Sequence, residues 1–103
     1  MPSFMIKLEV FKWIKDGLKT IEIRKGKALR GSRIVFIAGV RRGEMVILKA
    51  NILDKKEGSL SELLTESNFK RVVPIAESLN EAIAYVQSIY PNETMFTSYY
   101  FEQ

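Results

Sequence analysis

The residues that could do chemistry are concentrated in segment 17–31, where a single carboxylate, Glu22, stands between the cations Lys19 and Arg24. On a β-strand over residues 20–24, Glu22 and Arg24 would project from one face about 7 Å apart, with Lys19 at the mouth of the same site. A carboxylate between two cations stays ionised, orients both, and accepts a hydrogen bond from an amino or imino group. Cations suit phosphate or carbonyl oxygens, and the glutamate suits a base edge, so the segment predicts a nucleotide site.

The same residues also have simpler interpretations. Glu22 and Arg24 could form an ordinary surface ion pair worth roughly a few tenths of a kcal/mol, and spacing alone favours this interpretation. Trp13 could stack on a base, but its spacing from Val10 and Ile14 is more typical of a helix face packed into the core. Spacing therefore leaves both the nucleotide site and the surface pair open.

Composition excludes several classes of chemistry. The chain of 103 residues has no cysteine and no histidine. Disulfides, thiolate nucleophiles, Ser-His relays and the usual zinc sites are therefore excluded, and we expect neither a metal nor a cofactor. No apolar run approaches the roughly 20 residues that a membrane span needs, and the N-terminus does not resemble a secretion signal. We expect a cytoplasmic protein that does not enter a membrane.

Charge is distributed unevenly along the chain. Residues 1–50 carry 12 Lys and Arg against 4 Asp and Glu, whereas residues 51–103 carry 4 against 8. A basic face from the N-terminal half would attract a polyanion, although the same charges could simply keep the surface solvated. If RNA binds, we expect its phosphates to contact the basic residues after the motif. These are Lys25, Lys27 and Arg30, to which Arg41 and Arg42 could add.

The elements that must position these residues are predicted to form one domain over residues 1–103, because no repeat, linker or low-complexity tract divides the chain. Periodicity and turn residues predict about five or six strands and about three helices in an α+β fold, a mainly antiparallel, barrel-like sheet. The predicted strands are 3–8, 20–24, 33–38, 44 to about 53, and 95–101. The predicted helices are 9–16, 59 to about 66, and 78 to about 90.

Local signals predict where these elements begin and end. Gly17 stands where a left-handed residue would end the first helix. Ser59 and Ser78 each precede a glutamate by three residues, the pattern of a capping box. In the strand after Gly17, Ile21 and Ile23 would face the core while Glu22 faces the other way.

The order of these motifs resembles the ASCH domain family. The most specific part is the pattern G-x-K-x-x-E-x-R, present as Gly17, Lys19, Glu22 and Arg24. Other short segments match the family less specifically but occur in the same order, so that the resemblance spans most of the chain. They are WIKD at 13–16, RIVF at 33–36, SLSELL at 59–64, Pro74, SLNEA at 78–82 and IYP at 89–91.

The resemblance implies a PUA-like β-barrel with a cleft beside the helix that precedes the motif strand. It also implies a role in binding RNA or in acting on nucleosides. The leading hypothesis is a non-catalytic module that binds RNA or a nucleotide in a cleft lined by Lys19, Glu22 and Arg24. A nucleic acid, nucleoside or nucleotide is the expected partner, and the chain is assumed to be a monomer.

The alternative hypothesis is an enzyme. Small ASCH proteins of this size are similar to amidohydrolases that deacetylate 4-acetylcytidine, in which a lysine activates a threonine hydroxyl. Lys19 and Arg24 match that pattern. Glu22 stands where those enzymes have the threonine, the nearby Thr20 lies two residues too early, and Glu77 matches their distal glutamate only after a shift in register. Enzymatic activity is therefore left open.

Overall fold

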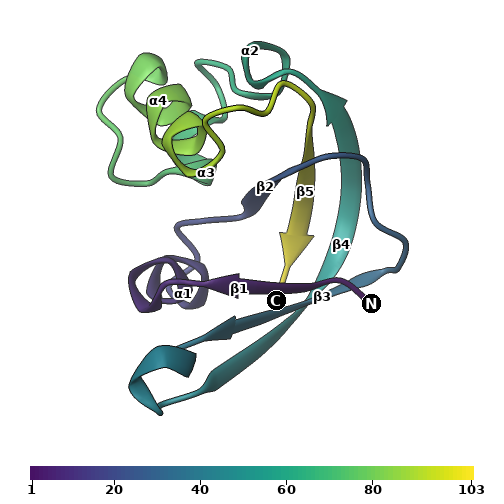
Figure 1. The fold of residues 1–103 in the computed structure, drawn as a ribbon, viewed down its shortest axis with the longest axis vertical. Helices are drawn as coiled ribbons and strands as arrows, with labels where there is room; N and C mark the ends of the chain where they lie inside the picture. Colours follow the sequence, from purple (N-terminus) through teal and green to yellow (C-terminus); the bar gives the residue numbers. More distant parts are fainter.

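The computed structural model covers residues 1–103 and contains a five-stranded sheet that curls into a half-barrel (Figure 1). The strand order is β1-β3-β4-β5-β2, in which β1 and β3 are parallel and all other neighbours are antiparallel. The predicted α+β fold with a mainly antiparallel, barrel-like sheet is confirmed. The strands are β1 (Ser3–Ile6), β2 (Ile21–Lys25), β3 (Arg33–Ala38), β4 (Val46–Gly58) and β5 (Phe96–Glu102).

Helices lie at both ends of the sheet (Figure 1). The helices that follow β4 gather at one end, and the helix that follows β1 lies beside that strand near the end that carries the β3–β4 hairpin. None of the helices is long and apolar enough to cross a membrane. The helices are α1 (Leu8–Lys15), α2 (Leu60–Leu63), α3 (Phe69–Val72) and α4 (Leu79–Ile89), with a 3-10 turn η1 (Val40–Arg42) in the hairpin.

The connection from α1 to β2 places the charged motif. Glu9 lies in the first turn of α1 and Lys15 in the last, where each charge suits the helix dipole. Gly17 then takes a φ of +78°, as the sequence predicted, and the chain turns back toward the sheet. The N–H groups of Leu18 and Lys19 both donate to the carbonyl of Trp13, so the turn is tied to the helix that it leaves.

Two hydrophobic clusters form the core. One contains Ile21 and Ile23 of β2 and lies between the sheet and helices α2, α3 and α4. The other contains Ile14 of α1 and lies inside the curl of the sheet. The alternation predicted for β2 is therefore correct, because its isoleucines face the first cluster while Glu22 faces the opposite side, paired in register with Tyr99 of β5.

Several elements differ from the sequence prediction. β1 ends at Ile6 rather than at residue 8, because α1 already begins at Leu8. β4 continues five residues past the predicted end at Leu53, because residues 54–58 pair with β5 beyond a β-bulge. α2 ends at Leu63 rather than about residue 66, because the side chain of Asn68 takes the place of the next helical turn. Its Nδ2 donates to the Leu63 carbonyl, and its Oδ1 accepts from the Thr65 N–H. The short helix α3 was not predicted.

The two capping boxes behave differently. Ser59 and Glu62 form a complete box, in which each side chain accepts a hydrogen bond from the other residue's backbone. Ser78 caps α4 by accepting from the N–H of Glu81. The carboxylate of Glu81 instead accepts from the N–H of Glu77, one residue before the expected partner.

The two glycines of the β3–β4 hairpin allow the backbone conformation of this turn to be tested. Gly39 and Gly43 flank η1 with φ values of +78° and +70°. A Cβ on Gly39 would collide with the carbonyl oxygen of Glu44, whereas a Cβ on Gly43 would meet nothing within 4 Å. Gly43→Ala should lower the free energy of unfolding by about 1–2 kcal/mol, the cost of a left-handed alanine. Gly39→Ala should lower it distinctly more, as measured by urea denaturation, and equal losses would contradict this geometry.

Candidate functional site

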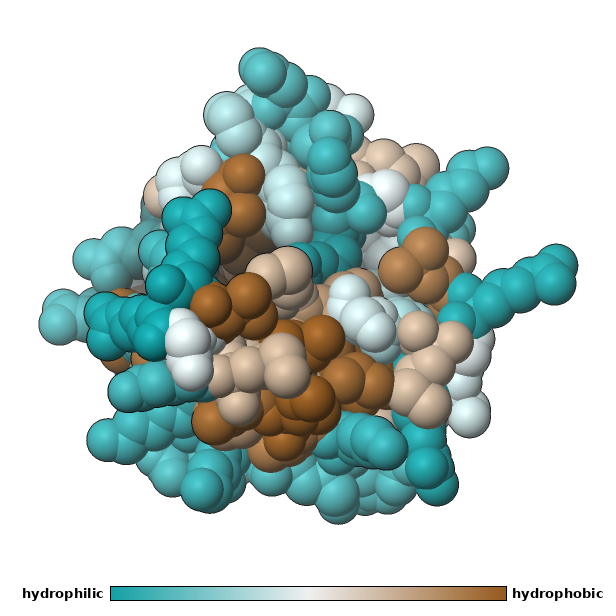
Figure 2. Space-filling view, turned by 60° about the horizontal axis from the view of Figure 1, so that its bottom comes forward, coloured by the Kyte–Doolittle hydropathy of each residue, from teal (hydrophilic) through white to brown (hydrophobic).

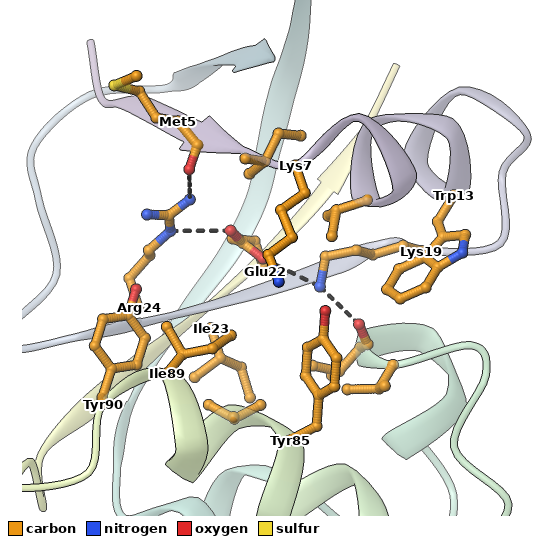
Figure 3. Close-up of a pocket in the computed structure, with 15 residues that line it drawn as sticks. Met5, Lys7, Trp13, Lys19, Glu22, Ile23, Arg24, Tyr85, Ile89 and Tyr90 are labelled. Carbon is orange, nitrogen blue, oxygen red and sulfur yellow. Dashed lines mark hydrogen bonds and ion pairs between the residues drawn. The ribbon is translucent and has the colours of Figure 1, made fainter. Parts of the chain in front are cut away.

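A pocket of about 180 Å³ opens between β1 and β2, the two edges of the sheet, where α1, α3 and α4 cover the gap (Figure 3). Of its 15 lining residues, 11 are hydrophobic. The charged members of the lining are Lys7, Lys19, Glu22 and Arg24. Apolar walls with a few converging polar groups are typical of a ligand-binding site.

Lys19, Glu22 and Arg24 form a continuous ion cluster in this pocket (Figure 3). The Nζ of Lys19 lies 3.1 Å from Oε1 of Glu22, and the Nε of Arg24 donates to Oε2 of Glu22 at 2.9 Å. Glu22 is only 7% exposed. The charges are therefore not an ordinary surface ion pair, and the structure brings the three residues together as the nucleotide-site interpretation requires.

Lys19 lies deeper than the sequence suggested. It was expected at the mouth of the site, but it is only 4% exposed. Its Nζ donates to the carbonyl of Ile21 at 2.9 Å and to the carbonyl of Val72 at 2.7 Å, in addition to the contact with Glu22. Because an ammonium has three N–H donors, all of them have a partner within the protein.

The environment of Lys19 affects its protonation in two opposing ways. Burial lowers the pKa of the Lys19 ammonium, whereas the charge and hydrogen bond of Glu22 raise it, and the nearby Arg24 charge lowers it again. The net direction is downward. Burial therefore outweighs the ion pair, as desolvation of a cation predicts.

Arg24 connects the two edges of the sheet. Its Nη2 donates to the carbonyl of Met5 in β1 at 3.1 Å, and its guanidinium lies 4.4 Å from the ring centroid of Phe4. The same side chain binds Glu22 within β2. Arg24 thus holds β1 and β2 at a fixed separation and helps to shape the pocket between them.

Aromatic residues complete the pocket. Trp13 is buried and lines the pocket, so it serves the core and the site together, with its ring 6.3 Å from that of Tyr85. The hydroxyl groups of Tyr85 and Tyr90 point toward the ion cluster (Figure 3). Burial raises the pKa of both phenols. Glu9 and Glu22 raise the pKa of Tyr85 further, while Arg24 opposes the shift of Tyr90. Both phenols therefore remain protonated hydrogen-bond donors near neutral pH.

Sequence patterns did not assign Tyr85 and Tyr90 to the site. The spacing of residues in α4 could have indicated them, because the apolar face of this helix contains Val86 and Ile89. Tyr85 precedes Ile89 by four residues, so the two share one side of the helix. Only knowledge of which helix packs beside β2 would have turned this spacing into a site prediction.

The other predicted site residues do not line the pocket. Thr20 faces α3 instead, where its Oγ1 accepts from the Nε of Arg71 at 2.8 Å and its backbone N–H donates to the Arg71 carbonyl. Glu77 is exposed ahead of α4. The remaining basic residues are exposed at the end of β2 and in the loop that follows it: Lys25, Lys27 and Arg30.

Comparisons with known proteins show what the fold is similar to. No protein-family model matches the chain, and no curated protein matches it. Among solved structures, an ASCH protein from Zymomonas mobilis aligns over 98% of this chain with a TM-score of 0.72 and 22% identity. The hypothetical protein PH0355 aligns over 99% of this chain and 98% of its own, with a TM-score of 0.75 and 21% identity.

The match defines the fold class. This chain has the fold of ASCH domain proteins, which confirms at the level of fold the resemblance seen in the G-x-K-x-x-E-x-R pattern. It spans 66% of the length of the Zymomonas mobilis ASCH chain.

The buried ion cluster predicts a large and specific stability effect. Glu22→Ala leaves Lys19 buried without its counter-ion, and should lower the free energy of unfolding by about 3–5 kcal/mol. The double variant Lys19→Met/Glu22→Leu removes both buried charges and should recover part of that loss, because the carbonyls of Ile21 and Val72 still lose the Lys19 donor. Urea denaturation measures both effects.

A matched control is the exposed pair of Lys25 and Glu93, whose atoms are 4.0 Å apart. Glu93→Ala removes the same kind of side chain and should cost less than about 1 kcal/mol. A loss of this small size in Glu22→Ala would show that the cluster is not a buried, coupled unit.

Proposed function

We propose that the chain binds RNA or a nucleotide by enclosing a base in this pocket. The observation that carries the proposal is the carboxylate of Glu22, buried and held from both sides by Lys19 and Arg24. Each carboxylate oxygen has two acceptor positions, and these contacts use one on each oxygen. The remaining positions suit an amino or imino group on a base edge.

The size of the pocket favours a single ring. An apolar cavity of roughly 150 Å³ can hold benzene, and this pocket has a volume of about 180 Å³. A single-ring pyrimidine would therefore fit. Cytosine combines this size with an exocyclic amino group that a glutamate can accept from. Cytosine is thus the base that the geometry favours most.

The walls and the rim of the pocket suit the rest of a nucleotide. Trp13 and Tyr85 offer aromatic surface, and base–aromatic stacking is worth about 1–3 kcal/mol per base. Lys7 is exposed and belongs to the lining, so its ammonium can meet a phosphate outside the apolar interior. The excess of cations in residues 1–50 would attract such a ligand from a distance.

Titration calorimetry with cytidine monophosphate at low salt tests the proposal. Glu22→Gln should weaken binding at least about tenfold, because a hydrogen bond to a charged group is worth about 1.5–3 kcal/mol. Glu66→Gln is the matched control at an exposed position and should bind normally. No measurable affinity for cytidine monophosphate, or equal affinities of the two variants, would refute the proposal.

A second pair of variants tests the pocket without altering its charges. Ile89 lines the pocket but is 53% exposed, so Ile89→Trp should fill the opening without disturbing the fold. Ile75 is also exposed, at 61%, and lies outside the lining, which makes Ile75→Trp the control. We expect the same calorimetric titration to show at least about tenfold weaker binding for Ile89→Trp alone. Unchanged affinity in that variant would place the ligand elsewhere.

Hydrolysis of 4-acetylcytidine is the second candidate, and the lowered pKa of Lys19 is the observation in its favour. Two features oppose it. All three N–H donors of the Lys19 ammonium have partners within the protein. The lining also contains no serine, threonine or cysteine, because Thr20 is directed to Arg71. A nucleophile in the pocket would have to be a tyrosine, a lysine amine, the Glu22 carboxylate or a water molecule rather than the threonine of those enzymes.

Incubation of the purified protein with 4-acetylcytidine, followed by chromatographic assay for cytidine, separates the two candidates. We expect no turnover, since the pocket holds no activated hydroxyl of the usual kind. Turnover that disappears in Lys19→Ala, with Lys15→Ala as an exposed control, would instead establish the enzyme.

A further inference from the structure

A second hollow lies beside the pocket, across the end of β1. This outer groove is lined by residues 5–9 and 37–42 and has a volume of about 710 Å³. Residues 5–7 line both the pocket and the outer groove. The two hollows therefore share a wall at the junction of β1 and α1, and a ligand in the pocket lies close to the outer groove.

The outer groove carries a net positive charge that no protein group neutralises. Its cations are Lys7, Arg41 and Arg42, and its one acidic side chain is Glu9. All four are exposed, and none has an ion-pair partner within 4.0 Å. Unpaired cations in a hollow are available to an anionic ligand, and the single carboxylate leaves them in excess.

The hairpin turn fixes the position of the two arginines. Gly39 and Gly43 take left-handed conformations on either side of η1, and the N–H of Glu44 donates to the carbonyl of Gly39 at 3.0 Å. This bond closes the turn that carries Arg41 and Arg42 along the groove. The cations therefore belong to a defined turn rather than to a chain end.

We propose that the outer groove holds the sugar-phosphate backbone of an RNA strand whose base occupies the pocket, so that the ligand is an oligonucleotide. This inference rests on the proposed function of the pocket. Phosphates of the adjoining nucleotides contact Arg41 and Arg42, while Lys7 lies where the strand passes from the pocket to the groove. Such contacts position a strand without reading its sequence.

The same end of the molecule also presents an apolar patch surrounded by hydrophilic side chains (Figure 2). Exposed apolar residues of β1 and the hairpin are Met5, Val40, Met45, Val46 and Ile47. A patch of this kind can bind a protein. The unpaired cations and the wall shared with the pocket favour RNA, since a nucleic acid needs phosphate contacts beside the site that holds its base.

Affinity measured against strand length and salt concentration tests this inference. Oligocytidylates from one to about six nucleotides, within the range that single-strand sites cover, should bind more tightly as they lengthen. Arg41→Ala/Arg42→Ala should abolish the gain with length but leave cytidine monophosphate binding unchanged. The slope of log affinity against log salt should fall by about 0.7 for each phosphate that the protein no longer neutralises, hence by about 1.4 for the double variant.

Arg33→Ala/Lys70→Ala is the matched control. It removes the same charge at exposed positions, one at the far end of β3 from η1 and the other on α3, and should keep the length dependence. The inference is overturned if affinity is independent of length, if the two double variants behave alike, or if Lys27→Ala/Arg30→Ala causes the larger loss. If cytidine monophosphate still binds in those cases, only the proposed role of the outer groove is overturned. If cytidine monophosphate does not bind, the proposed function of the pocket is overturned as well.

Discussion

The carboxylate of Glu22 can leave water only because two cations accompany it, and the arrangement of the site depends on this constraint. A buried, unpaired carboxylate would be strongly destabilising or would take up a proton. Lys19 and Arg24 prevent both outcomes, and each is fixed in turn by a backbone carbonyl elsewhere in the fold. One ion cluster therefore joins β2 to α3 through Val72 and to β1 through Met5. The charges that would recognise a ligand also hold the walls of the pocket in place.

The pocket lies between the two unpaired edges of the sheet. β1 and β2 are edge strands that do not pair with each other, so the half-barrel has an open seam. Edge strands normally need protection against pairing with other chains. Here α1, α3 and α4 cover the seam, and Arg24 bridges it by donating to the Met5 carbonyl. Incomplete closure of the sheet thus creates a sheltered hollow next to ionised groups.

Much of this arrangement could be predicted from local patterns, because local physics determines it. Gly17 ends α1 in a left-handed conformation, and Ile21 and Ile23 alternate with Glu22 across β2. Burial of the cluster was harder to predict. The carbonyl that holds the Lys19 ammonium belongs to Val72, 53 residues along the chain, and no local pattern records such a contact. Tyr85 could not be assigned to the site from the sequence for the same reason, since its position depends on where α4 packs.

Recognition of a base by the Glu22 carboxylate is best tested by a crystal structure of the protein bound to a short oligocytidylate. We predict one cytosine in the pocket with its amino group within hydrogen-bonding distance of the Glu22 carboxylate, and with Lys19 and Arg24 still bound to that carboxylate. A base bound elsewhere on the surface, or a pocket in which Lys19, Glu22 and Arg24 separate into solvent, would contradict this prediction.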